Sequence, residues 1–321
     1  MKKLISIGEA LIDFIPSKVN CEFKEVPSFE RACGGAPSNV AAVYSLLGGK
    51  SEIITQLGND GFGEYIIYTL KKAGVDTSHI MRTNKANTAL AFVSLKDDGS
   101  REFTFYRKPS ADMLLEPEQI ELEWFKDCGV LHFCSVDLID APVKKTHVKA
   151  IEEAKKAGAY ISFDPNIRLP LWDGAEECKK TVREFLKYAD ILKISDEELE
   201  FITGETDINT ASKKLFDGGA KAVLYSLGKE GSMLITPNFT VKAENYPVKA
   251  VDTTGAGDAV IGAFLFKLIE SGKAIEEISS DEMQGFLKYA NAYSNHSVCG
   301  HGAITSYGEA GEIEEFIKKF S

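Results

Sequence analysis

Residues 252–258 read Asp252-Thr253-Thr254-Gly255-Ala256-Gly257-Asp258, and the almost wholly apolar stretch Ala259–Ile269 follows directly. Two glycines in front of a buried helix allow several backbone N–H groups to converge on one point, where the helix dipole adds positive charge. Such a point holds a phosphate or stabilises a phosphoryl group during its transfer. This segment therefore predicts a phosphate-handling site at the start of a buried helix.

Asp258 stands in the first turn of that helix, where its carboxylate would repel a phosphate. A base that removes the proton of an attacking hydroxyl must lie against that phosphate, so catalysis would explain the position. Asp is also a common helix N-cap residue. A short motif does not choose between these two interpretations.

Upstream of this motif, short apolar runs alternate with helical patterns. The runs are continuously hydrophobic, which is typical of parallel strands that are buried on both faces. They are Leu4–Ile7, Ile53–Leu57, Val130–Phe133, Tyr160–Phe163, Ile191–Ile194 and Ala222–Leu227. Between them, Pro37–Leu47 and Val143–Ala157 have helical character and are each followed by glycine. This alternation predicts a doubly wound α/β fold, with a mainly parallel sheet flanked by helices.

Two segments interrupt the alternation. Ala89–Leu95 and Arg101–Arg107 are strand-like, and the turn sequence Lys96-Asp97-Asp98-Gly99 joins them as in a β-hairpin. The segment Phe14–Ala32 is extended in character and lacks helical periodicity.

We expect these two insertions, at about residues 14–33 and 87–109, to form a small β-sheet lid over the mouth of the α/β domain. The alternative is that they are edge strands of the main sheet. No repeat or flexible linker divides the sequence, so residues 1–321 are expected to form a single domain with this lid.

Composition and charge narrow the classes of function. The chain has 321 residues, of which 44% are hydrophobic and 26% charged, as in an ordinary globular enzyme. Its formal net charge of −11 argues against nucleic acid or an anionic membrane as partner, because phosphates attract basic surfaces. Six cysteines without C-x-x-C pairs indicate free thiols in a reducing compartment. The N-terminal apolar run is too short for a signal peptide and no stretch reaches membrane-spanning length, so we expect a cytoplasmic protein.

A second constellation lies near the N-terminus. Gly34-Gly35-Ala36-Pro37-Ser38-Asn39 leads into a helix, and Asp13 follows the first predicted strand. Paired glycines allow a ligand to approach the backbone, and Asp13 and Asn39 offer hydrogen bonds to vicinal hydroxyls, as in polyol recognition. A tight turn at a helix start would account for the glycines alone, but it would not account for Asp13.

These motifs, together with Gly58-Asn59-Asp60-Gly61-Phe62-Gly63, stand in the order and spacing of the ribokinase-like (PfkB) carbohydrate kinases, which the chain resembles over nearly its whole length. The resemblance implies a central sheet flanked by helices, a β-lid, and in-line phosphoryl transfer from Mg-ATP. It implies that Asp258 is the base and that Gly255, Ala256 and Gly257 form the anion hole. The sugar would be held by Asp13, Gly34, Gly35 and Asn39.

The resemblance extends to the nucleotide side. Ser226-Leu227-Gly228-Lys229-Glu230-Gly231 is similar to the family's loop beneath the nucleotide, although a hairpin turn would also explain Gly228 and Gly231. Asn291 stands where an adenine-side residue is expected. Ser195-Asp196-Glu197-Glu198 resembles the family's Asn-x-x-Glu element, which orders water around magnesium; Ser195 replaces Asn, and the segment also reads as a capping box. The resemblance further allows a monovalent cation such as K⁺ at Asp252.

Two arginines complete the candidate site. Asp164-Pro165-Asn166-Ile167-Arg168 closes a strand at the edge where α/β sheets bind ligands, and Arg168 suits either a phosphate or a surface carboxylate. The segments Phe105–Asp112 and Asp164–Trp172 resemble the fructokinase branch of the family. Arg107 would then reach the sugar from the lid; a solvent-exposed arginine at a strand end is the alternative.

The resemblance therefore predicts phosphorylation of D-fructose to D-fructose 6-phosphate, with ATP and Mg²⁺. Kinases for 2-keto-3-deoxygluconate and aminoimidazole riboside share the scaffold and remain alternatives, because Arg107 and Arg168 would suit a substrate carboxylate. A catalytically silent sugar-binding regulator is the alternative from another class, and the intact Asp258 argues against it. Lids of this kind often pair, which suggests a homodimer through the lid.

Overall fold

The computed structural model describes residues 1–18, 20–95 and 101–320. Its main sheet contains all the apolar runs of the sequence, each with ends within two residues of those expected. Across this sheet the order is β13 (Thr240–Ala243), β12 (Ser232–Ile235), β11 (Ala222–Ser226), β10 (Ile191–Ser195), β9 (Tyr160–Asp164), β8 (Cys128–Cys134), β1 (Lys3–Ile7), β4 (Ser51–Gly58) and β5 (Ile80–Thr83). The pairs from β5 to β11 are parallel, while β12 and β13 run antiparallel at one edge.

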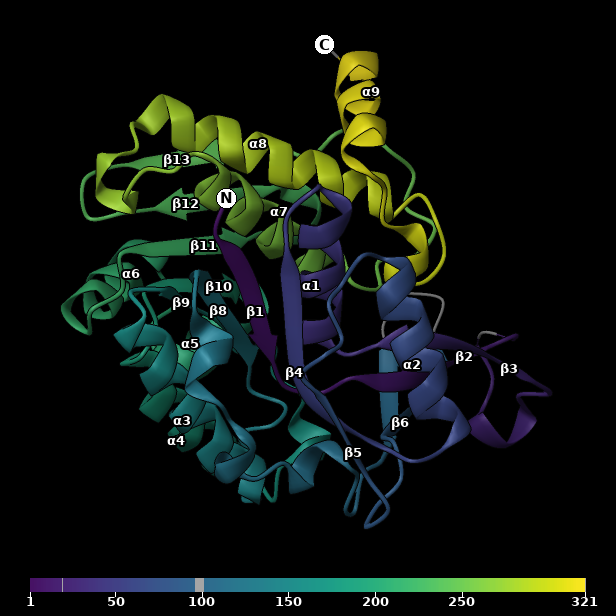
Figure 1. Ribbon diagram of the computed structural model, residues 1–321. Coiled ribbons are helices and arrows are strands. Elements are labelled where there is room, and N and C mark those ends of the chain that lie inside the picture. Colours follow the sequence, from purple (N-terminus) through teal and green to yellow (C-terminus); the bar gives the residue numbers. More distant parts are fainter. Residues whose placement is uncertain (19, 96–100, 321) are drawn as a thin grey trace.

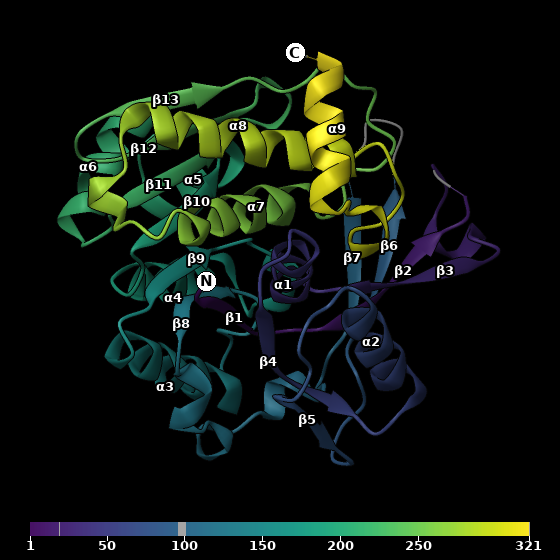
Figure 2. The ribbon, with the colours of Figure 1, turned by 45° about the horizontal axis from the view of Figure 1, so that its top comes forward.

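Helices cover both faces of this sheet (Figures 1 and 2). One layer holds α1 (Ala36–Leu46), α2 (Gly61–Lys72), α7 (Ala256–Glu270), α8 (Ser280–Ser297) and α9 (Ala310–Phe320). The other holds α3 (Pro142–Lys156), α4 (Ala175–Leu186), α5 (Asp196–Thr203) and α6 (Ile208–Asp217). Successive strand residues alternate between the two cores: Leu4 packs with the first layer, and Ile5 and Ile7 pack with the second. This double burial is why the strands read as continuous hydrophobic runs.

The described residues contain no helix with both the length and the hydrophobicity to span a lipid bilayer.

The strand order reverses between β1 and β8. From β1 the chain builds outward through β4 to β5, and it then returns to β8 and builds the other way through β9, β10 and β11. Loops that leave the carboxyl ends of β1 and β8 therefore diverge, and a crevice opens between them. Ligands bind at such a switch point in open α/β sheets.

A separate small sheet lies beside α2, at the right of Figure 1. Its order is β3 (Phe29–Gly34), β2 (Leu11–Pro16), β6 (Leu90–Leu95) and β7 (Arg101–Tyr106). β2 pairs antiparallel with β3 and parallel with β6, and β6 pairs antiparallel with β7. The two insertions therefore meet in one sheet, and the alternative of edge strands in the main sheet is wrong. The expected turn at residues 96–99 lies outside the described residues.

Helices α1 and α7 approach each other closely because α7 has a glycine at their contact. A Cβ atom on Gly262 would lie 2.9 Å from the Cβ and Cγ1 atoms of Val43 and 3.3 Å from the carbonyl oxygen of Val40. Both distances are shorter than van der Waals contact allows without movement of α1. Gly262 therefore sets the spacing between the helix that carries Asn39 and the helix that carries Asp258.

We expect Gly262→Val to lower the free energy of unfolding by about 1–3 kcal/mol, because the added methyl groups overpack the contact with Val43. Urea unfolding followed by circular dichroism measures this change. The double variant Gly262→Val/Val43→Ala should recover part of the loss. Gly285→Val is the matched control, since a Cβ on Gly285 of α8 meets nothing within 4 Å. Equal losses at positions 262 and 285 would contradict the packing argument.

Candidate active site

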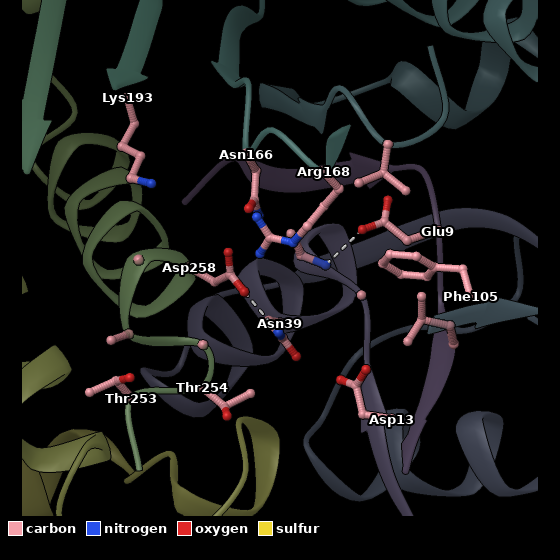
Figure 3. Close-up of a pocket in the computed structure, with 17 residues that line it drawn as sticks. Glu9, Asp13, Asn39, Phe105, Asn166, Arg168, Lys193, Thr253, Thr254 and Asp258 are labelled. Atoms are coloured by element: carbon pink, nitrogen blue, oxygen red, sulfur yellow. Dashed lines mark hydrogen bonds between the residues drawn. The ribbon is translucent and has the colours of Figure 1, made fainter. Parts of the chain in front are cut away.

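A cavity of about 260 Å³ opens at the carboxyl ends of the strands beside the switch point (Figure 3). The loops after β1, β8 and β9, together with β10 itself, contribute Glu9, Val136, Asn166, Arg168 and Lys193. The start of α1 contributes Gly35, Ala36 and Asn39, the small sheet contributes Leu11, Asp13 and Phe105, and the start of α7 contributes residues 253–258. The cavity thus brings together the C-terminal motif and most of the N-terminal constellation.

Asp258 is buried in the first turn of α7 and its side chain faces α1. Its Oδ2 atom accepts a hydrogen bond from Nδ2 of Asn39 at 2.8 Å, which Figure 3 shows as a dashed line. Gly255 occupies the N-cap position, so the N-cap interpretation of Asp258 is wrong. Burial raises the pKa of Asp258 above its ordinary value, while Asn39, Lys193 and Arg168 oppose this rise. The carboxyl group is therefore a stronger base than an exposed aspartate.

At the start of α7, the two glycines lie close to other side chains. Gly255 has a φ of 74°, and a Cβ atom there would lie 2.3 Å from the hydroxyl oxygen of Tyr307. That hydroxyl donates a hydrogen bond to the Gly255 carbonyl at 2.9 Å. A Cβ on Gly257 would lie 3.1 Å from Nζ of Lys193. The N–H of Ala256 donates to the carbonyl of Thr253 at 3.3 Å, and residues 253–258 line the cavity, so the N-terminus of α7 and its partial positive charge lie at the cavity wall.

Three charged residues lie behind this turn. Nζ of Lys193 lies 3.0 Å from Oδ2 of Asp164, and both residues are buried. Burial raises the pKa of Asp164 to about 7, although Lys193 opposes the rise. Burial acts to lower the pKa of Lys193, but the nearby carboxylates of Asp164 and Glu198 outweigh it and raise that pKa. Burial also acts to raise the pKa of Glu198, but Lys193 and the backbone N–H groups of Ile167 and Ser195 hold it below its ordinary value. The ammonium group is thus held charged in the interior.

The opposite wall holds the residues expected to bind a sugar. Asp13 and Asn39 both line the cavity, and Figure 3 shows Asp13 on the side away from Lys193. Gly34 allows Asp13 to take this position, because a Cβ on Gly34 would lie 2.0 Å from its Oδ2 atom. Gly35, with a φ of 102°, opens α1 at the cavity wall. Oε1 of Glu9 accepts the N–H of Ala36 at 3.0 Å and fixes that turn.

Arg107 lies elsewhere than expected. It is 3% exposed and forms ion pairs with Asp112 and Asp137, which are also buried. Arg107 does not line the cavity that contains Asp258, although Phe105, two residues earlier, does. The alternative of a solvent-exposed arginine is therefore wrong. The expected contact of Arg107 with a sugar stays a prediction, since Arg107 lines a neighbouring cavity that also includes Phe105. Arg168, by contrast, lines the cavity.

The predicted nucleotide residues lie at the same edge of the sheet. Ser195 and Ser226 end neighbouring strands and are register partners between β10 and β11. Gly228 and Gly231 have positive φ values of 51° and 99° in the hairpin that joins β11 to β12, which confirms the turn interpretation of these glycines. None of these four residues lines the cavity with Asp258.

Asn291 is buried, and the protein itself binds its side-chain amide. It is 1% exposed on α8, where its Nδ2 donates to the carbonyl of Ala243 at 2.8 Å and its Oδ1 accepts from Oγ of Ser232 at 2.7 Å. The side-chain amide thereby ties α8 to β12 and β13. Both ends of the amide are thus held by the protein, and the expected place of Asn291 on the adenine side of the nucleotide stays a prediction.

The candidate metal residues are already engaged by hydrogen-bond donors. Glu198 accepts the N–H of Ile167 at 2.8 Å on Oε1 and the hydroxyl of Ser195 at 2.8 Å on Oε2. Asp252 accepts the N–H of Thr254 at 2.9 Å and the N–H of Gly302 at 2.9 Å. In the part of the chain that the structure describes, no group of three or more His, Cys, Asp or Glu side chains could hold a metal ion. These carboxylates suit a cation held through water or together with a substrate.

The sequence interpretation missed three residues of this site. Lys193 interrupts the apolar run Ile191–Ile194, and this single charge in a buried strand was the available signal. Glu9 directly follows Gly8 after the first strand, at the position where ligand-facing loops begin. Tyr307 carries no signal in the sequence, since its contact with Gly255 spans 52 residues.

A family model described as pfkB family carbohydrate kinase matches residues 1–310 of the chain. Among curated relatives, probable fructokinase-2 of Arabidopsis thaliana is 42% identical over 316 residues, which cover 98% of this chain and 95% of the relative.

Two solved structures are similar over almost their full length. The fructokinase of Xylella fastidiosa with bound ATP has a TM-score of 0.87 and 31% identity, covering 99% of this chain and 98% of that one. The fructokinase of Vibrio cholerae O395 with bound fructose, ADP and calcium ion has a TM-score of 0.89 and 32% identity, covering 98% of this chain and 99% of that one.

We expect Arg107→Met to lower the free energy of unfolding by about 3–5 kcal/mol, because it leaves Asp112 and Asp137 buried without their cation. Adding Asp112→Asn and Asp137→Asn to the same chain should restore much of the loss, since the uncompensated charges are then removed. Arg31→Met is the control: Arg31 is exposed and packs over the ring of Tyr65, so about 1 kcal/mol or less is expected. Urea unfolding compares the variants, and an Arg107→Met protein as stable as Arg31→Met would contradict a buried ion pair.

Proposed function

The chain belongs to the pfkB family of carbohydrate kinases, and we propose that it transfers the γ-phosphoryl group of ATP to D-fructose, giving D-fructose 6-phosphate and ADP. One observation carries the proposal: Asp258 is buried at the N-terminal turn of α7 and lines the same cavity as Asp13 and Asn39. A base, an anion site and hydroxyl-binding groups are thus within one small volume. The fructokinase relatives, with bound ATP in one and bound fructose in another, support this choice of substrates.

The reaction requires little covalent chemistry from the protein. Asp258 would accept the proton of the sugar hydroxyl as the hydroxyl oxygen forms a bond with the γ-phosphorus. The bond between that phosphorus and the bridging oxygen of ATP breaks, and ADP leaves with the electron pair. The backbone N–H groups around Gly255, Ala256 and Gly257, with Arg168, would stabilise the charge on the transferred group. The raised pKa of Asp258 increases its affinity for the proton.

We assign the sugar to Asp13, Gly34, Gly35 and Asn39. Asp13 offers a carboxylate to hydroxyl donors, and the two glycines expose backbone at the cavity wall. We propose that Arg107 acts from the neighbouring cavity, which also includes Phe105, while its Nη2 atom pairs with Asp112 and Asp137. A neutral ketohexose suits this wall better than the carboxylate of 2-keto-3-deoxygluconate, which the carboxylate of Asp13 would repel.

We assign the nucleotide to the adjoining sheet edge, where Ser195, Ser226, Gly228 and Gly231 lie. A solved structure of a putative ribokinase II from E. coli is in complex with ATP and Mg²⁺, and we propose that Mg²⁺ accompanies ATP here as well. Glu198 fits such an ion through coordinated water, because its oxygens already accept hydrogen bonds and no cage of protein ligands surrounds it within the described residues. When bound, Mg²⁺ would neutralise phosphate charge.

Two further assignments concern a monovalent cation and the pairing of two chains. Asp252 holds the loop before α7 through Thr254 and Gly302, and we propose that a monovalent cation such as K⁺ binds beside it. We also propose that two copies of the chain pair through the small sheet, where Phe23 and Tyr106 are 42% and 59% exposed around the half-buried ring of Phe92. Sedimentation equilibrium would test the pairing.

A coupled assay of ADP release across a panel of sugars tests the proposed function. We expect kcat/KM for fructose to exceed that for ribose, 2-keto-3-deoxygluconate and aminoimidazole riboside. Asp258→Asn should lower kcat by about 10²–10⁴, the range for loss of a general base, while nucleotide affinity measured by calorimetry is retained. A higher specificity constant for another sugar would overturn the choice of fructose. Near-normal turnover of Asp258→Asn would remove this residue from the mechanism, and no turnover with any sugar would favour a silent regulator.

The hydrogen bond from Asn39 predicts how activity depends on pH. Asp258 must be ionised to accept a proton, so kcat should fall as the pH falls through its pKa, which burial raises above the ordinary value. The Asn39 bond favours the ionised form, so Asn39→Ala should raise the pKa further and move the acid limb of the profile to higher pH. Asn209→Ala, at an exposed position on α6, is the control and should leave the limb in place. An unmoved or lowered limb in Asn39→Ala would contradict this coupling.

A further inference from the structure

Lys193 is the one residue of β10 whose side chain is charged, and the pleat directs it toward α7. Ile191 packs in the core beneath α1 and α7, and Leu192 and Ile194 pack in the opposite core. Since side chains two residues apart share a face of a strand, Lys193 lies on the same face as Ile191. Figure 3 shows it extending from the end of β10 toward the helix that carries Asp258.

The ammonium group lies between a carboxylate and the anion site. Nζ of Lys193 is 3.0 Å from Oδ2 of Asp164 at the end of β9, and a Cβ on Gly257 would lie 3.1 Å from the same Nζ atom. Lys193 is 7% exposed and lines the cavity with residues 253–258. An ammonium carries three N–H donors, and one ion-pair partner leaves donors for an anionic ligand beside Gly257.

A purely structural role explains this arrangement poorly. A buried ion pair contributes little net stability compared with apolar residues of similar size, because both charges lose their hydration. Apolar residues fill the neighbouring positions of β10 without difficulty. The buried charge of Lys193 therefore adds little to the stability of the fold, and binding of an anionic ligand would explain why a charged residue stands here.

We propose that Lys193 binds the phosphoryl group that is transferred, and that Asp164 positions its ammonium group. The inference rests on the proposed function and adds a side-chain cation to the backbone N–H groups at the start of α7. As the phosphoryl group moves, negative charge spreads over its equatorial oxygens, and a fixed cation in a site closed to water stabilises that charge. Lys193 would thereby distinguish a nucleoside triphosphate from a diphosphate.

Calorimetry on the full chain with Mg²⁺ tests this assignment, using a non-hydrolysable ATP analogue and ADP as probes. In Lys193→Met we expect affinity for the analogue to fall about 10- to 100-fold, the value of one charge-assisted hydrogen bond, while affinity for ADP stays within about threefold. The kcat should fall about 10²–10³-fold. Lys193→Met/Asp164→Asn should show the same nucleotide discrimination with better stability, because the unpaired carboxylate is also removed.

Lys221→Met is the matched control, since Lys221 precedes β11 and pairs with Glu276 away from the cavity. It should leave both affinities and kcat unchanged. The assignment is overturned if the parent binds both probes and phosphorylates sugar while the two Lys193 variants bind the analogue normally, or lose the analogue and ADP equally. If the parent itself fails to bind the analogue, the proposed kinase function fails instead, and the two failures are thus separable.

Discussion

The hydrogen bond between Asn39 and Asp258 joins residues 219 positions apart, and the site depends on it. One partner lies near the start of α1 and the other in the first turn of α7. The bond can form because Gly262 allows the two helices to approach each other against Val43. Helix spacing, set deep in the core, therefore determines the position of a carboxylate at the surface of a cavity.

The charged groups of the site are buried, and neighbouring polar or charged groups act on the pKa of each. Asp258, Asp164 and Lys193 are buried, and burial alone would neutralise each of them. Asn39 and Lys193 oppose this for Asp258, and the neighbouring carboxylates keep Lys193 positive. The result is a base of raised pKa beside a fixed cation, both next to the N-terminus of α7. A phosphate-transferring site needs this separation of roles, because the group that accepts a proton must not cancel the charge that holds the phosphate.

The face of the sheet beneath α1 and α7 differs from the other face. Near the carboxyl ends of the strands it carries buried polar side chains, namely Ser6, His132, Ser162, Asp164 and Lys193. The strand residues between them, such as Phe133, Phe163 and Leu192, pack in the opposite apolar core. Of the five polar residues, Lys193 lines the cavity, and Asp164 pairs with it. Because each strand contributes only one or two polar residues, this pattern is visible only when the strands are placed side by side.

The sequence alone determined the architecture, because parallel strands buried on both faces must be continuously apolar and the glycines before α7 must be free of side chains. It also determined the principal groups of the site, since Asp13, Asn39 and Asp258 stand in motifs whose backbone needs are local. The tertiary structure decided the partners of the long side chains. Arg107 is buried against Asp112 and Asp137 and does not face solvent. Asn291 binds the backbone of β13, and Lys193 faces the start of α7. The partner of each long side chain is a carboxylate, a carbonyl or a helix end that packing brings close to it. Because these partners lie far away in the sequence or on other elements, only the assembled fold determines them.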